Sequence, residues 1–151
     1  MNHEATTVEL RQSVGKIRWL QIIGAGLAIV ALSFVILTLI TTVYAFQLAI
    51  ETRGSPDQVA IGRFAAKLSH WLMPASRALL IFLAAVLIGR KTGRLAILHG
   101  VLLGICVGLL TLGTSLFFGG RISVRALVFA VLLACVGWLG GFIGAKHAMH
   151  D

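Results

Sequence analysis

Four long apolar runs, separated by short polar connections, constrain the fold of this 151-residue chain more than any other feature. A helix needs about 20 apolar residues to cross the hydrocarbon core of a bilayer. Each run is long enough, and backbone polar groups in lipid must be hydrogen-bonded within their own segment, so each run should be helical. We therefore predict a single-domain, all-α, polytopic membrane protein over residues 1–151. The predicted spans, packed as an antiparallel bundle, are 20–50, 71–90, 95–118 and 123–146.

The charge pattern agrees with this class. Only 12% of the residues are charged, whereas a soluble domain usually carries about a quarter. Lys and Arg number 13 against five Asp and Glu, but they lie in short clusters between the apolar runs and form no basic face. We therefore expect no nucleic-acid binding, and we expect anionic lipid head groups as partners of these flanking cations.

The basic flanks also predict an orientation, because loops rich in Lys and Arg stay in the cytoplasm. A cytoplasmic N-terminus places seven basic residues inside and five outside, so both termini are predicted to be cytoplasmic. The first run is too long for a cleaved signal peptide and should remain as an anchor. The inside set is Arg11, Lys16, Arg18, Arg90, Lys91, Arg94 and Lys146, and the outside set is Arg53, Arg63, Lys67, Arg121 and Arg125.

The only sizeable polar segment joins the first two runs. Residues 55–58 read Ser-Pro-Asp-Gln, which predicts a helix start with Ser at the N-cap. Apolar residues then recur at helical spacing, and Arg63 and Lys67 share the other side. We expect an amphipathic interfacial helix over 56–70, lying on the outer membrane surface; the alternative is a lid or a docking surface for a partner. Pro74 either ends this helix or lies in the first turn of the next span.

Small residues line one face of each of the last two runs, with Thr111 and Ser115 continuing the face of the third run. Helix association in lipid cannot rest on the hydrophobic effect, and small residues let backbones approach. In an antiparallel hairpin, residues that are equally far in sequence from the connecting turn lie at the same depth. Gly100 is therefore expected level with Gly141, and Gly104 level with Gly137. The prediction is that these two helices pack face to face, unless the glycines face a second copy or have no packing role. The predicted helix-packing residues are Gly100, Gly104, Gly108, Gly137, Gly141 and Gly144.

Arg77 is the one clearly ionisable residue inside a run. A second span without it would hold about twelve residues, or ~18 Å, which is too short for a core of ~30 Å. Arg77 should therefore lie below the outer interface, either snorkelling to the head groups or forming an anion or lipid-head-group site that faces the bundle.

Other candidate groups carry weaker signals. His147 and His150 have a spacing that can bind metal, but no metal site is predicted there, because the helix should fray and a terminal cation suits the helix dipole. His99 and His70 are expected at opposite membrane faces, so they cannot clamp one haem iron. Two cysteines, Cys106 and Cys135, should lie at one depth and point away from each other, as apolar fillers without a disulfide.

Catalytic patterns are missing from the sequence. The runs contain no Asp or Glu apart from Glu51 at an edge, no metalloprotease, hydrolase or nucleotide-binding motif, and no hydroxyl beside a base. We therefore expect neither an enzyme nor a cofactor.

The pattern His99-Gly100-x-x-x-Gly104 and the pattern Gly140-Gly141-x-x-Gly144 resemble the YrzE-like bacterial membrane proteins, which are small four-helix proteins without an established activity. The likeness covers the second half of the chain, and the long basic connection after the first run departs from it. It implies residence in the bacterial inner membrane.

These observations lead to one functional expectation with two alternatives. The leading expectation is an oligomer-forming or accessory structural subunit of a larger membrane assembly, contacting itself or other membrane proteins. The first alternative is a small channel or transporter for an anionic or lipid-like solute. The second is a pigment- or haem-binding membrane subunit.

Overall fold

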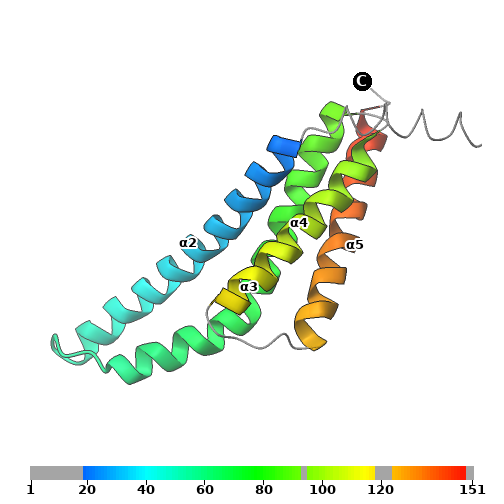
Figure 1. The fold of residues 1–151 in the computed structure, drawn as a ribbon. Coiled ribbons are helices and arrows are strands. Elements are labelled where there is room, and N and C mark those ends of the chain that lie inside the picture. The colour runs from blue at the N-terminus through cyan, green and yellow to red at the C-terminus, as the bar shows by residue number, and fades with distance from the viewer. Residues whose placement is uncertain (1–18, 93–94, 118–123, 149–151) are drawn as a thin grey trace, which may run out of the picture.

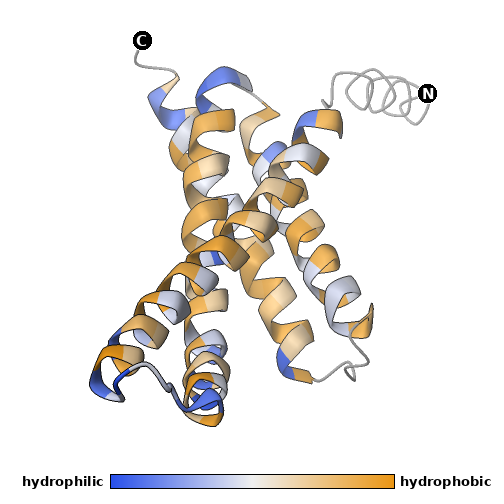
Figure 2. Cartoon of the chain, turned by 90° about the vertical axis from the view of Figure 1, so that its left-hand side faces the viewer, coloured by the Kyte–Doolittle hydropathy of each residue, from blue (hydrophilic) through white to orange (hydrophobic). Residues whose placement is uncertain are grey.

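Four long helices make up the part of the chain that the computed structural model describes, residues 19–92, 95–117 and 124–148. All four are long and apolar enough to cross a membrane, so the prediction of an all-α chain with four potential spans is confirmed. Figure 2 shows apolar residues along their length and hydrophilic residues mainly near their ends. The helices are α2 (Trp19–Glu51), α3 (Gln58–Thr92), α4 (Ala96–Phe117) and α5 (Val124–His147).

The helices differ in length. The 22 residues of α4 and the 24 of α5 correspond to about 33 and 36 Å, close to the thickness of a hydrocarbon core. The 33 residues of α2 and the 35 of α3 correspond to about 50 Å or more, so both must tilt or project to fit the same layer. In Figure 1, α2 is inclined relative to α5, and the connected tips of α2 and α3 lie away from α5.

A helix-ending motif with a left-handed residue closes α2. The Gly54 amide donates to the Ala49 carbonyl at 2.8 Å, and the Arg53 amide donates to the Ile50 carbonyl at 3.4 Å. Arg53 has a φ of 52°, which places it in the left-handed region. This Schellman arrangement satisfies the last carbonyls of α2 and turns the chain towards α3.

The N-cap of α3 is Asp57 and not the predicted serine. The Asp57 carboxylate accepts a hydrogen bond of 2.8 Å from the Val59 amide, and its carbonyl accepts one of 3.1 Å from the Ile61 amide. An aspartate side chain is as good an N-cap as serine, and its negative charge suits the positive end of the helix dipole. The sequence therefore predicted a capped helix start in this segment correctly, but it placed the N-cap two residues too early.

One continuous helix, α3, covers both the predicted interfacial segment 56–70 and the predicted span 71–90. Pro74 lies inside it, and Figure 1 shows a bend in the middle of α3. Proline lacks the amide that would bond to the carbonyl four residues earlier, which is the usual cause of such a bend. The predicted interfacial helix is therefore not seen as a separate element, because the proline bends α3 without ending it.

The apolar face predicted for 56–70 packs against α2. The rings of Phe64 and Tyr44 stack with their centroids 3.9 Å apart. Ile61 and Ala65, on the same face, line a groove shared with α2. The apolar face of the first part of α3 is therefore covered by the second half of α2, which runs beside it.

Glycines bring α4 and α5 into backbone contact. A Cβ atom added to Gly104 would lie 2.7 Å from the Ala134 Cα, and one added to Gly108 would lie 3.1 Å from the Ala130 Cβ. A Cβ on Gly100 would meet Gly137 and Gly141. Along this contact, the residue numbers of the α5 partners decrease as the residue numbers of the α4 glycines increase. No side chain larger than hydrogen fits at Gly100 or Gly104 unless the helices separate.

The register of this contact includes both predicted level pairs and adds further neighbours. A Cβ on Gly100 would lie 3.2 Å from the Gly141 Cα and would also meet Gly137, and a Cβ on Gly137 would lie 3.4 Å from the Gly104 amide nitrogen. A Cβ on Gly104 itself would meet Leu133 and Ala134. Closely packed helices interleave, so a small residue fits between residues i and i+4 of its neighbour and does not oppose a single partner. The predicted pairs are therefore in contact, but each glycine also meets a second residue one helical turn away or closer, which the prediction did not include.

The other edge of the α5 glycine stripe faces α3. A Cβ on Gly140 would lie 2.8 Å from the Ala85 Cβ, and one on Gly144 would lie 2.9 Å from the Gly89 Cα. Placing Gly144 against the third run was therefore wrong, and Gly140 was missed. At 100° per residue, the four α5 glycines cover about 100° of the helix, which is wide enough to serve two neighbours. α5 thus packs on both α3 and α4, while α2 contacts α3 and α4 but not α5.

We expect Gly104→Ile and Gly137→Ile each to destabilise the protein by about 3 kcal/mol or more, because the new side chain would overlap the facing backbone. Gly24→Ile is the matched control, since a Cβ at Gly24 meets nothing within 4 Å. Thermal unfolding in mild detergent measures the effect. Equal melting temperatures for all three variants would contradict the packing described here.

Candidate functional site

Arg77 is buried among three helices. Only 7% of its surface is exposed, and its Nη1 donates a hydrogen bond of 3.0 Å to the Thr111 hydroxyl on α4. Its guanidinium carbon lies 5.8 Å from the centre of the Phe34 ring on α2, within cation–π range. The side chain is thus turned into the bundle and does not snorkel to the head groups.

The positive charge of Arg77 has no acidic side chain beside it among the described residues of the four helices. Its Nε is buried and forms no hydrogen bond to a described residue. The described residues include only two acids, Glu51 and Asp57, and Glu51 follows Phe34 by 17 residues, or about 25 Å along α2. A buried charge without a counterion costs several kcal/mol, and the hydrogen bond to Thr111 and the contact with Phe34 offset only part of that cost.

Thr111 is a well-oriented acceptor for Arg77. Its hydroxyl donates to the Val107 carbonyl at 2.7 Å, which directs the hydrogen along α4 and leaves a lone pair for the guanidinium. Thr111 was predicted to continue the glycine face towards the fourth run. The structure turns it to α3 instead, and sequence periodicity carried no signal for its pairing with Arg77.

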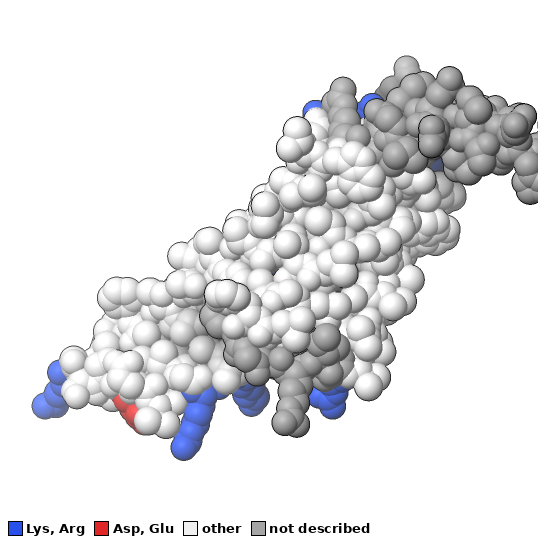
Figure 3. Space-filling model, viewed as in Figure 1, with Lys and Arg blue, Asp and Glu red and all other residues white. Residues whose placement is uncertain are grey.

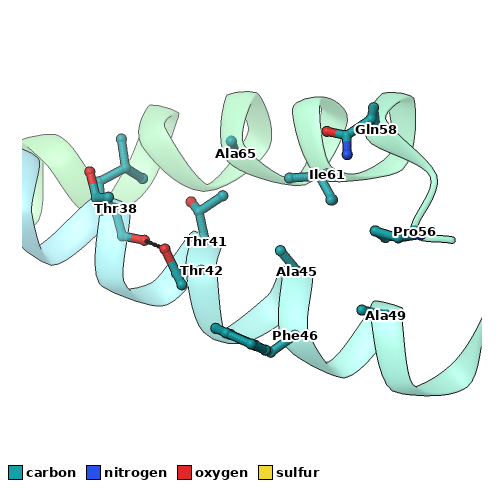
Figure 4. Close-up of a pocket in the computed structure, with 11 residues that line it drawn as sticks. Thr38, Thr41, Thr42, Ala45, Phe46, Ala49, Pro56, Gln58, Ile61 and Ala65 are labelled. Carbon is teal, nitrogen blue, oxygen red and sulfur yellow. Dashed lines mark hydrogen bonds between the residues drawn. The ribbon is translucent and has the colours of Figure 1, made fainter. Parts of the chain in front are cut away.

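An open groove of about 580 Å³ lies between the second half of α2 and the first part of α3 (Figure 4). Thr38 and Thr42 line it, and each donates its hydroxyl to a carbonyl of its own helix. Thr41 also lines it, and its buried hydroxyl oxygen has no partner among the described residues. Thr41 is thus the lining threonine whose hydroxyl makes no hydrogen bond to a described residue. The remaining lining residues are Leu37, Ala45, Phe46, Ala49, Pro56, Gln58, Ile61 and Ala65.

A second open groove, of about 670 Å³, lies between the start of α2 and α4. Gly113 lines it, and a Cβ added there would meet nothing within 4 Å. The other lining residues are Trp19, Ile22, Ile23, Leu102, Ile105, Cys106, Leu109, Leu110, Thr114 and Phe117. This groove is almost wholly apolar.

The histidines are not gathered into a metal site among the described residues, where no three His, Cys, Asp or Glu side chains come together. His99 is buried, with its Nδ1 2.8 Å from the Leu95 carbonyl and its Nε2 without a hydrogen-bond partner. The Nδ1 of His147 lies 3.0 Å from the Ile143 carbonyl, and His150 falls outside the described residues.

Both cysteines are free thiols. Cys106 packs towards α2, where a Cβ on Gly26 would lie 3.1 Å from its sulfur, and Cys135 is exposed on α5. Cys106 therefore fills space beside the closest approach of α2 to α4.

Comparison of the chain with family models, characterised proteins and solved structures finds no match. The resemblance of the second half to YrzE-like proteins stays a prediction.

Replacing Thr111 by valine should lower the free energy of unfolding by about 1–3 kcal/mol, because the guanidinium loses its acceptor while staying buried. Thr38→Val serves as the control, since Thr38 is exposed and bonds only to its own helix. Chemical denaturation in detergent compares the two. If the two substitutions lower the free energy of unfolding equally, the Arg77–Thr111 hydrogen bond contributes no more to stability than the exposed Thr38 hydroxyl does.

Proposed function

We propose that the chain forms an antiparallel four-span bundle in the bacterial inner membrane, with both termini cytoplasmic. The start of α2 and the end of α5 lie at one end of the molecule, as an even number of spans requires (Figure 1). Figure 3 shows Lys and Arg at the two ends and a broad uncharged band between them, which fits two interfaces on either side of a hydrocarbon layer. Among the described residues, Arg90, Lys91 and Lys146 lie at the first end, Arg53, Arg63, Lys67 and Arg125 lie at the second, and Arg77 is the buried exception.

Within that membrane, the function best supported is an oligomer-forming or accessory structural subunit of a larger assembly. The observation that carries it is the apolar groove between α2 and α4. Gly113 opens onto this groove with free space at its Cβ, whereas Gly100, Gly104 and Gly108 on the same helix all contact α5. Small residues beside an open groove are the surface on which membrane helices pack, so a helix of a second subunit is the expected occupant.

Cysteine cross-linking tests this assembly role. In a chain with Cys106→Ala and Cys135→Ala, Gly113→Cys should form oxidant-dependent disulfide adducts of higher mass in the native membrane, with itself or with a cysteine of a partner subunit. Gly24→Cys, on an exposed part of α2 with no close neighbour, should form far fewer.

Denaturing gels and mass spectrometry measure the adducts and identify the second chain. Adduct levels at Gly113→Cys no higher than at Gly24→Cys would count against an occupied groove.

The burial of Arg77 favours a second candidate, a small channel or transporter for an anionic or lipid-like solute. A cation without a counterion lowers the barrier for an anion inside a membrane. Proteoliposomes should then release an entrapped anion, and Arg77→Met should reduce the rate at least about tenfold. Release that is equal for the two proteins would leave only the assembly role.

A further inference from the structure

We propose that Arg77 is a binding site for a phosphate-type oxyanion, held by the edge of the guanidinium that carries the Nε and Nη2 hydrogens. Nothing in the assembly role requires this site. The transport candidate would require it, but binding does not require transport.

The hydrogen bonding of Arg77 leaves the Nε on that edge without a partner among the described residues. Nη1 lies on the Cδ side of a guanidinium, and it is the nitrogen that donates to Thr111. Nε and Nη2 share the opposite edge, and the Nη1 bond is the only one that Arg77 makes to a described residue. Two parallel N–H groups match two oxygens of a phosphate, a bidentate geometry that an ammonium cannot supply.

The surroundings of Arg77 select an anion that comes from outside the helices. None of the four helices contains an acid apart from Glu51 at the end of α2. The Phe34 ring lies 5.8 Å from the guanidinium carbon, and the hydrogens on Nε and Nη2 lie in the guanidinium plane, which is where an oxyanion would meet them. An oxyanion in that plane would satisfy the buried Nε and neutralise the charge together.

The depth of the site fits a phosphate drawn from the adjacent interface. Thr111, which marks the level of Arg77 on α4, precedes the end of the helix at Phe117 by six residues, or about 9 Å. A phosphate group from a lipid head group or from solution would need to enter only this far. The two sources share the same chemistry at Arg77, and the experiment below separates them.

Binding is measured on the full chain in an uncharged detergent, by native mass spectrometry with three probes. The probes are phosphatidylglycerol, diacylglycerol, which lacks the phosphate, and inorganic phosphate. We expect the wild type to bind phosphatidylglycerol at least about tenfold more tightly than diacylglycerol, and Arg77→Met to lose that preference. Arg63→Met is the matched control for the loss of a flanking cation, because Arg63 is exposed on the same helix; its loss should lower the preference much less than Arg77→Met does.

The probes assign the source of the anion. Binding of phosphatidylglycerol alone identifies a lipid head group, and Arg77-dependent binding of inorganic phosphate identifies a site open to solution. The proposal is overturned if the wild type shows no preference for a phosphate-bearing probe, or if Arg77→Met keeps it.

Stability without ligand gives a second readout. Because Arg77→Met removes an uncompensated buried charge, we expect its melting temperature without phosphate to equal or exceed that of the wild type. A lower melting temperature would make Arg77 a structural residue that is satisfied by Thr111 and Phe34, and would overturn the proposal. Neither readout depends on the cross-linking at Gly113, so the two proposals fail separately.

Discussion

The backbone contact of α5 with two neighbours is the interaction on which the rest of the structure depends. Lipid tails are as apolar as leucine, so helices in a membrane gain little from burying leucine against leucine and must gain from close packing. Gly137 and Gly141 supply this on one side of α5, and Gly140 and Gly144 supply it on the other. The result is close backbone packing of α5 on α3 and α4, beside a buried apolar cluster to which α2 also contributes through Ile22, Ile29 and Val30.

The remaining helix, α2, is attached by a different kind of contact. It makes one close small-residue contact, at Gly26 beside Cys106, and it places Phe34 over the guanidinium of Arg77. Open grooves flank both halves of it. The buried charge of Arg77 therefore lies where α2, α3 and α4 meet, next to a helix that has no contact with α5.

The sequence predicted the positions of the helices more accurately than it predicted which helices pack against each other. Apolar length alone located all four, because a spanning segment has few alternatives. Helical periodicity identified the glycines of α5 but assigned Gly144 to α4, whereas Gly144 contacts α3. When a glycine face is about 100° wide, periodicity does not show which of its residues contact which neighbouring helix. Pro74 was read as a boundary because its missing amide usually marks one, yet α3 continues through it. The direction of the Arg77 side chain depended on Thr111 and Phe34, which are distant in sequence and carry no shared motif.

Arg53, the left-handed residue after α2, bears on how the fold balances two requirements. A glycine would adopt a φ of 52° without steric conflict, whereas arginine loses on the order of 1 kcal/mol in that conformation. The position nevertheless carries a cation, at the tip of the α2–α3 hairpin. The turn is thus less stable than a glycine would make it, at a position whose side chain carries a permanent charge. At the end of two long apolar helices, that charge would keep the tip of the hairpin out of an apolar layer.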